Sequence, residues 1–209
     1  MHHYCALWCV AQNSGHAMSF GGQNGDAQSL FDARGQRKYL CDSERRAFLA
    51  AANRADAPTR IFCHLLAYTG ARISEGLAVT PRHLDADGPR VIFRTLKRRK
   101  RIYRAVPIPS ALFADLLALA KGGAPDAPLW AWCRQTAWRH IHSIMQAASI
   151  KGPQATPRGL RHGFCMNAAM RNIPPNLIQR WAGHASPDTT AIYVDASGVE
   201  ERAFAERMW

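Results

Sequence analysis

Acidic residues are scarce in this sequence, and long apolar runs are missing. Its 209 residues include 15 Asp and Glu against 27 Lys and Arg, a formal net charge of +12 at pH 7. Such an excess attracts polyanions, so nucleic acid is the leading partner and an anionic membrane surface the second. No apolar run approaches the roughly 18 residues of a membrane span, and the N-terminus lacks the pattern of a signal peptide. We therefore expect a soluble, cytoplasmic protein with no membrane partner.

The sequence also lacks paired cysteines. Its six cysteines form no Cys-X-X-Cys motif, which is the usual mark of a structural zinc site. Reduced thiols in a cytoplasm explain them. His2, His3, Cys5 and Cys9 could meet at a metal, but a frayed N-terminus supplies such clusters by chance. We expect no metal and no other cofactor.

The chain changes character near residue 39. Residues 1–38 are rich in Gly, Asn, Gln and Ser and show no sustained periodicity, so we interpret them as a loosely ordered lead-in. Residues 39–209 carry regular apolar patterns without a clear linker, which predicts one domain.

Apolar residues at helical spacing predict most of the secondary structure. A first helix begins at a cap formed by Asp42 or Ser43, a second ends at Thr69-Gly70, and a third covers residues 71–79. Later stripes are interpreted as core-facing sides of further helices: Leu112, Leu116 and Leu119; Trp138, Ile141 and Met145; and Leu177, Ile178 and Trp181.

One segment has the pattern of a β-hairpin. Residues 90–96 and 102–106 are rich in β-branched and aromatic side chains, and the charged residues 97–101 between them fit a turn. The expected fold is therefore mainly α with a small antiparallel β-sheet.

This hairpin carries the densest basic run, RTLKRRKRIYR, which contains no acid. By itself such a run is usually a solvated face or a nonspecific patch. On a hairpin, however, it can lie along a DNA groove and place one lysine beside a phosphate. The DNA-binding residues that we expect here are Arg94, Arg98, Arg99, Lys100, Arg101 and Arg104.

Two further segments carry candidate functional residues. Arg158 and Arg161 share one face of a predicted helix, where two guanidinium groups repel unless an anion lies between them; the alternative is two independent surface arginines. Downstream, Ser186 can cap a short helix that carries Tyr193. Taken alone, Tyr193 is an ordinary half-buried tyrosine and His184 a turn histidine.

Four segments together resemble the motif blocks of a known family. TGARISEGL, the basic hairpin ending in VPIP, RGLRHGF, and WAGHASPDTTAIY occur in that order. They resemble the tyrosine recombinases, also called the lambda-type phage integrase family, and most of all the short plasmid- and transposon-type integrases. The resemblance implies the catalytic-domain fold of that family. It also implies a site-specific recombinase that cleaves and rejoins DNA through a 3′-phosphotyrosyl intermediate.

The resemblance assigns roles to individual residues. It implies that Tyr193 is the nucleophile, that Glu75 orients Arg72, and that the other catalytic residues are Arg72, Lys97, Arg161 and His184. Lys97 would be the general acid.

One position departs from the family pattern. Arg158 stands where most members have histidine; it could join the arginines that hold the phosphate, but it cannot act as a base near neutral pH. His162 points about 100° away from Arg161 on a helix and is a poor substitute, so the base stays unassigned.

Only 38 residues precede the region that resembles the family, whose members usually have a separate N-terminal DNA-binding domain. We therefore expect a homodimer or homotetramer on double-stranded DNA, or an accessory protein that replaces the absent domain. The expected location is the bacterial cytoplasm, at the nucleoid. Two alternatives stay open: a catalytically inactive DNA-binding protein on the same fold, and a type IB topoisomerase-like enzyme that relaxes DNA without site choice. An RNA-binding protein would explain the charge but not the ordered motifs.

Overall fold

The computed structural model describes residues 29–85, 87–95, 102–194, 202 and 205–209. Helices dominate these residues, and one small antiparallel sheet accompanies them, as the sequence predicts. The helices are α2 (Asp42–Ala52), α3 (Ala57–Thr69), α4 (Ile73–Leu77), α5 (Ser110–Ala120), α6 (Arg134–Ala147), α7 (Pro157–Met170), α8 (Pro175–Ala182) and α9 (Asp188–Val194). The strands are β1 (Leu84–Asp85), β2 (Arg90–Thr95) and β3 (Ile102–Pro107), and a 3-10 turn, η1 (Pro81–His83), precedes β1.

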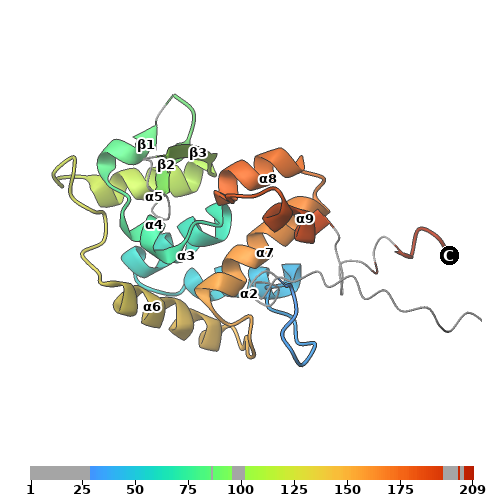
Figure 1. Ribbon diagram of the computed structural model, residues 1–209. Helices are drawn as coiled ribbons and strands as arrows, with labels where there is room; N and C mark the ends of the chain where they lie inside the picture. The colour runs from blue at the N-terminus through green and yellow to red at the C-terminus, as the bar shows by residue number, and fades with distance from the viewer. Residues whose placement is uncertain (1–28, 86, 96–101, 195–201, 203–204) are drawn as a thin grey trace, which may run out of the picture.

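The sheet has the strand order β1-β2-β3, and both pairs are antiparallel. The predicted hairpin is β2–β3, in register from Arg90 opposite Pro107 to Thr95 opposite Ile102. β1 was not predicted, because two residues are too short to show an alternating pattern. In Figure 1 the sheet and α5 lie at one end of the molecule, and α7, α8 and α9 lie beside them.

Helix α3 organises the core. It lies beside α2, α5 and α7 (Figure 1), and its apolar residues are almost entirely buried. At its start the Asp56 side chain accepts a hydrogen bond from the Thr59 backbone N–H. At its end Gly70 has a left-handed backbone (φ 61°), and a Cβ there would overlap the ring of Phe164 on α7. Glycine is therefore required where α3 meets α7.

Part of the lead-in is ordered, contrary to our expectation. Leu30 is buried in an apolar cluster with residues of α7 and α9, and Phe31 forms a β-bridge with Arg37. The Asp32 side chain accepts the backbone N–H groups of Arg34 and Gln36, so the polar residues of this segment close a turn. Residues 1–28, with the histidines and cysteines of the N-terminus, lie outside the described residues.

Two details of the predicted helices were wrong. α2 begins after Cys41 rather than after Asp42 or Ser43, because Glu44 reaches back to the Cys41 backbone N–H. On α6, Ile141 and Met145 are buried as predicted, but Trp138 is 42% exposed and stacks on His142. Among the helices described, none has the length and apolar character needed to span a membrane.

Candidate active site

Arg161 lies at the centre of the site, on the buried side of α7. Thr156 caps this helix by accepting the Gly159 backbone N–H, and Pro157 occupies its first position, so the local sequence fixes where α7 starts. Arg161 Nη1 donates to the carbonyl oxygens of Gly70 (2.7 Å) and Ala182 (2.6 Å), at the ends of α3 and α8. Its Nη2 is buried and has no hydrogen-bond partner within the described residues.

Arg72 is the second arginine of the site. It precedes α4, and its Nη1 lies 3.0 Å from Glu75 Oε1, while its backbone N–H donates to Glu75 Oε2. Arg72 also acts on Arg161, because burial and then the charge of Arg72 lower the pKa of Arg161 to about 10. Two cations so close together favour an anion between them.

Glu75 is a buried carboxylate that pairs with two arginines. It is 2% exposed, and its Oε2 accepts a hydrogen bond from Arg104 Nη2 at 2.7 Å. Burial alone would raise its pKa, but Arg104 and Arg72 hold the pKa of Glu75 below its usual value. Glu75 therefore stays ionised, and both of its oxygens contact Arg72.

Arg104 is placed differently from the sequence-based expectation of a DNA contact. It is 6% exposed; its Nε donates to the Trp181 carbonyl oxygen at 2.8 Å, and its Nη1 lies 3.3 Å from Thr95 Oγ1. A Cβ at Gly183, whose φ is 69°, would lie 3.0 Å from its Cζ. With its bond to Glu75, Arg104 joins the hairpin to α4 and to the end of α8. Its guanidinium therefore faces inward in this structure, between Glu75 and the end of α8.

His184 follows Gly183, in the turn between α8 and α9. Its ring stacks on that of Tyr193, with centroids 5.8 Å apart and an interplanar angle of 12°. Its Nδ1 lies 2.9 Å from Thr190 Oγ1. Burial, then Arg161 and Arg72, lower the pKa of His184 to about 3, so its imidazole is neutral near pH 7.

Tyr193 lies on α9, next to α7, and is 1% exposed. Its Oη is 2.6 Å from His162 Nδ1, and the nearby Cys165 thiol contributes to a raised pKa of Tyr193. Burial raises the pKa of Tyr193, so the free phenol is protonated near neutral pH. On the other side of the His162 ring, Nε2 lies 3.3 Å from Arg158 Nε.

Comparisons with known proteins identify the family of this chain. The sequence profile of the phage integrase family matches residues 38–198. The chain belongs to the phage integrase family. Tyrosine recombinase XerA of Pyrococcus furiosus is 27% identical over 201 residues, which cover 90% of this chain and 68% of that protein.

Solved structures of tyrosine recombinases share the fold. The crystal structure of XerA recombinase matches with a TM-score of 0.69 and 24% identity, over 81% of this chain and 64% of that one. XerH site-specific recombinase bound to difH substrate matches with a TM-score of 0.65 and 17% identity, over 85% of this chain and 59% of that one. The chain spans between 46% and 68% of the length of the first curated relatives that it matches.

Within this family fold, the residues expected from the motifs divide into three groups. The structure brings together Arg72, Glu75, Arg161, His184 and Tyr193, around the junction of α4, α7, α8 and α9. Lys97, Arg98, Arg99, Lys100 and Arg101 lie outside the described residues. Arg94 on β2 and Arg158 on α7 are exposed.

His162 is the site residue that sequence reasoning set aside. An offset of about 100° from Arg161 directs the His162 side chain to another side of α7. α9 packs on that side of α7 and brings Tyr193 to His162. The available signal was the i,i+4 spacing from Arg158, which puts the two side chains on one face of a helix.

Proposed function

We propose that residues 39–209 form the catalytic domain of a tyrosine recombinase that cleaves and rejoins double-stranded DNA through a 3′-phosphotyrosyl bond to Tyr193. The preceding residues from Leu30 onward pack at its edge. Target choice would make the enzyme a site-specific recombinase or integrase, and the reaction uses neither a metal nor an organic cofactor.

One observation carries this proposal. Arg161 is buried, Nη1 is held by two carbonyl oxygens, and Nη2 has no partner within the described residues. A buried guanidinium donor without an acceptor costs free energy in an ordinary core, on the order of 1–3 kcal/mol. The cost is reasonable at an anion site, and Arg72 supplies a second positive charge there.

The proposed reaction gives a role to each of the predicted catalytic residues. Arg72 and Arg161 hold the nonbridging oxygens of the phosphate, and Arg158 is available as a third guanidinium. His184 is neutral, so it donates from Nε2 to the phosphate when Nδ1 accepts the Thr190 hydroxyl proton. Lys97 gives a proton to the leaving 5′ oxygen. The phosphotyrosyl bond keeps the energy of the broken bond, so rejoining needs no nucleotide cofactor.

The burial of Tyr193 adds a step before chemistry. Because its side chain is 1% exposed, the side chains that cover Oη have to shift before a phosphate reaches it. We therefore propose that DNA binding precedes and promotes this shift.

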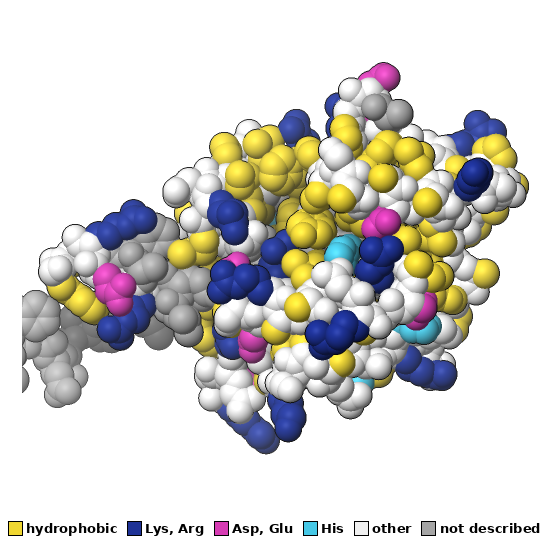
Figure 2. All heavy atoms as spheres, turned by 180° about the vertical axis from the view of Figure 1, so that it is seen from behind, with side chains coloured by type: hydrophobic (Ala, Val, Ile, Leu, Met, Phe, Trp, Pro, Cys, Tyr) yellow, Lys and Arg dark blue, Asp and Glu magenta, His cyan; other side chains and the backbone are white. Residues whose placement is uncertain are grey.

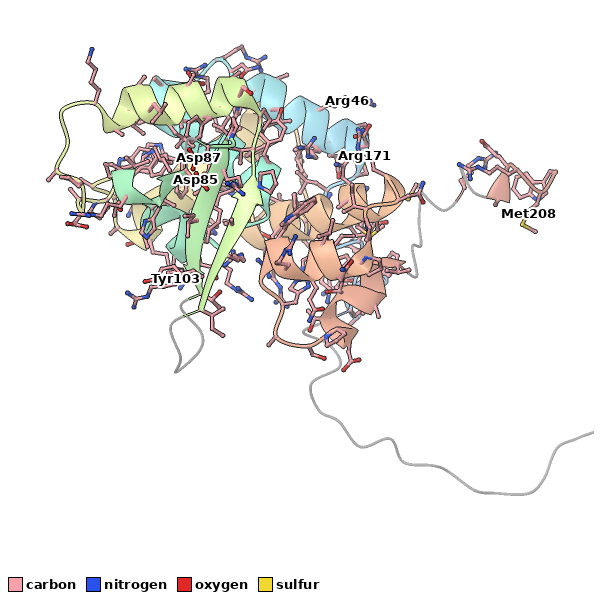
Figure 3. The ribbon with its side chains drawn as sticks, turned by 90° about the horizontal axis from the view of Figure 1, so that it is seen from above. Arg46, Asp85, Asp87, Tyr103, Arg171 and Met208 are labelled. Carbon is pink, nitrogen blue, oxygen red and sulfur yellow. The ribbon has the colours of Figure 1, made fainter. Side chains whose placement is uncertain are left out.

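The DNA would lie across the face that carries the hairpin. Figure 3 shows Tyr103 near the start of β3, next to the part of the hairpin that lies outside the described residues. Its side chain is 53% exposed. On the face in Figure 2, Lys and Arg side chains are spread widely, with fewer acidic side chains between them. We propose that Arg94 and residues 98–101 contact the backbone of DNA, and that a homodimer, a homotetramer or an accessory protein completes the complex. The expected location is the bacterial cytoplasm, at the nucleoid.

A trapping experiment tests the nucleophile. Duplexes from the DNA that flanks the coding region are nicked so that cleavage releases a short fragment and prevents rejoining. The wild-type protein should form a protein–DNA adduct that survives SDS, whereas Tyr193→Phe should form none and bind DNA equally well. Phe keeps the packing of the ring and removes only the oxygen.

The matched control is Tyr103→Phe, which changes an exposed tyrosine and should leave adduct formation unchanged. An adduct that persists in Tyr193→Phe would refute the assignment of the nucleophile. Binding without any adduct in the wild type would favour the inactive DNA-binding protein, and relaxation of an unrelated supercoiled plasmid would favour topoisomerase-like activity.

A further inference from the structure

His162 contacts a guanidinium, which can only donate hydrogen bonds, and the phenol of the proposed nucleophile. Its ring is 8% exposed and lies between Arg158, four residues earlier on α7, and Tyr193 on α9. The distances are 3.3 Å from Arg158 Nε to His162 Nε2 and 2.6 Å from His162 Nδ1 to Tyr193 Oη. The three residues therefore form a hydrogen-bonded chain that ends at the proposed nucleophile.

The chemistry of these groups fixes the direction of the chain. A guanidinium donates hydrogen bonds and never accepts them, so His162 Nε2 has to be the acceptor of the Arg158 bond. Burial, then the charges of Arg158, Arg161 and Lys38, lower the pKa of His162 to about 4, so the ring carries one proton at neutral pH. That proton is on Nδ1, and Nδ1–H donates to Tyr193 Oη.

The opposite direction would place two N–H groups against each other. If Tyr193 donated its proton to Nδ1, the ring proton would be on Nε2, where it would face Arg158 Nε–H. The Cys165 thiol on α7 lies close enough to Tyr193 to raise the pKa of the phenol, so it is a group to which the hydroxyl can turn its proton. Both contacts of Tyr193 are therefore satisfied when the hydroxyl accepts from His162 and donates to the thiol.

We propose that His162 is a catalytic residue that donates its Nδ1–H to the Tyr193 oxygen, and that Arg158 is a positioning residue that holds His162 in this tautomer. The inference rests on the proposed function. It gives Arg158, at the position where most relatives have histidine, a role that needs no proton transfer by its own side chain. It also excludes His162 as the base that deprotonates Tyr193.

The proton balance of cleavage then follows. The Tyr193 O–H bond breaks and its proton passes to water, the Oη–P bond forms, and the bond from phosphorus to the 5′ oxygen breaks. Lys97 supplies one proton to that oxygen, so one proton is released and one is taken up. The His162 hydrogen bond stabilises negative charge on Oη during attack, and again when the phenolate leaves during rejoining.

Nitrogen NMR of the full chain with labelled histidine tests the tautomer in free protein. In the wild type we expect His162 Nδ1 to be protonated and Nε2 to be unprotonated. Arg158→Met removes the donor and should move part of the proton population to Nε2. Arg171→Met, a control at the other end of α7, should leave the signals unchanged. Protonated Nε2 in the wild type, or no change in Arg158→Met, would overturn the proposal.

Two variants test the catalytic role with the nicked duplex. His162→Asn places an amide near the position of Nδ1, and His162→Gln places one near Nε2. Adduct formation should stay within about tenfold of the wild type for Asn and fall by about 10² for Gln, as for the loss of one transition-state donor.

The outcomes separate this inference from the function on which it rests. Equal and large losses in both variants, with folding retained, would show that His162 takes the phenol proton and would overturn the inference alone. No adduct from the wild type would overturn the proposed function and the catalytic role with it, while the NMR result would still decide whether Arg158 fixes the tautomer.

Discussion

Replacement of Arg104 by methionine should be among the most destabilising single changes in the hairpin. Methionine retains much of the unbranched side chain but leaves Glu75 buried without its 2.7 Å partner. The two side chains are 4% and 1% exposed, so solvent screens their interaction little. Breaking such a buried pair from one side costs about 3–5 kcal/mol, against a total stability of roughly 5–15 kcal/mol for a domain.

Denaturant unfolding of the two proteins measures this cost. The matched control is Arg82→Met, because Arg82 pairs with Asp126 at 2.6 Å but both side chains are largely exposed, at 65% and 77%. An exposed pair contributes up to about 1 kcal/mol, so the control should unfold almost like the wild type. The double variant Arg104→Met, Glu75→Leu removes both charges and should recover part of the loss.

The function should decline together with the stability. Without Arg104, the pKa of Glu75 should rise, because burial then acts with less compensation from positive charge. Arg72 loses its ionised partner as Glu75 takes up a proton, so adduct formation should become more sensitive to acid. A cost below about 1 kcal/mol for Arg104→Met, equal to that of Arg82→Met, would contradict the buried-pair reasoning.

Three further results are expected. The free energy of unfolding should decrease as the pH is lowered from about 6.5 to about 4, by about 1.4 kcal/mol per pH unit for each of His162 and His184. In this range only the unfolded chain takes up protons on these two side chains. His184→Gln should reduce this slope, and an unchanged slope would contradict the assignment. Lys97→Ala should slow cleavage by about 10² to 10⁴ with little change in binding, and a bridging 5′-thio substrate, whose leaving group needs no proton, should recover most of that loss. DNA binding measured by titration should weaken steeply with salt and survive EDTA; a loss on chelation would contradict a metal-free reaction.

Periodicity and turn chemistry in the sequence were sufficient for most of the fold. The helices around Phe62, Ile141 and Ile178 and the hairpin of β2 and β3 were predicted, because each has a repeating apolar pattern that local geometry explains. β1 and the turn around Asp32 were missed, since neither is long enough to show a period.

For the site, the sequence predicted catalytic roles for Arg72, Arg161, His184 and Tyr193 through the resemblance of four ordered motifs to a family, and these roles stay predictions. It did not determine which way a side chain faces when its neighbours come from distant segments. Arg104 belongs to a basic run, yet Glu75, 29 residues earlier, draws it into the interior. Tyr193 reaches His162 across 31 residues, through the packing of α9 on α7. Such contacts depend on burial and on charge in three dimensions, so the inward turn of Arg104 and the contact between Tyr193 and His162 were decided by the tertiary structure alone.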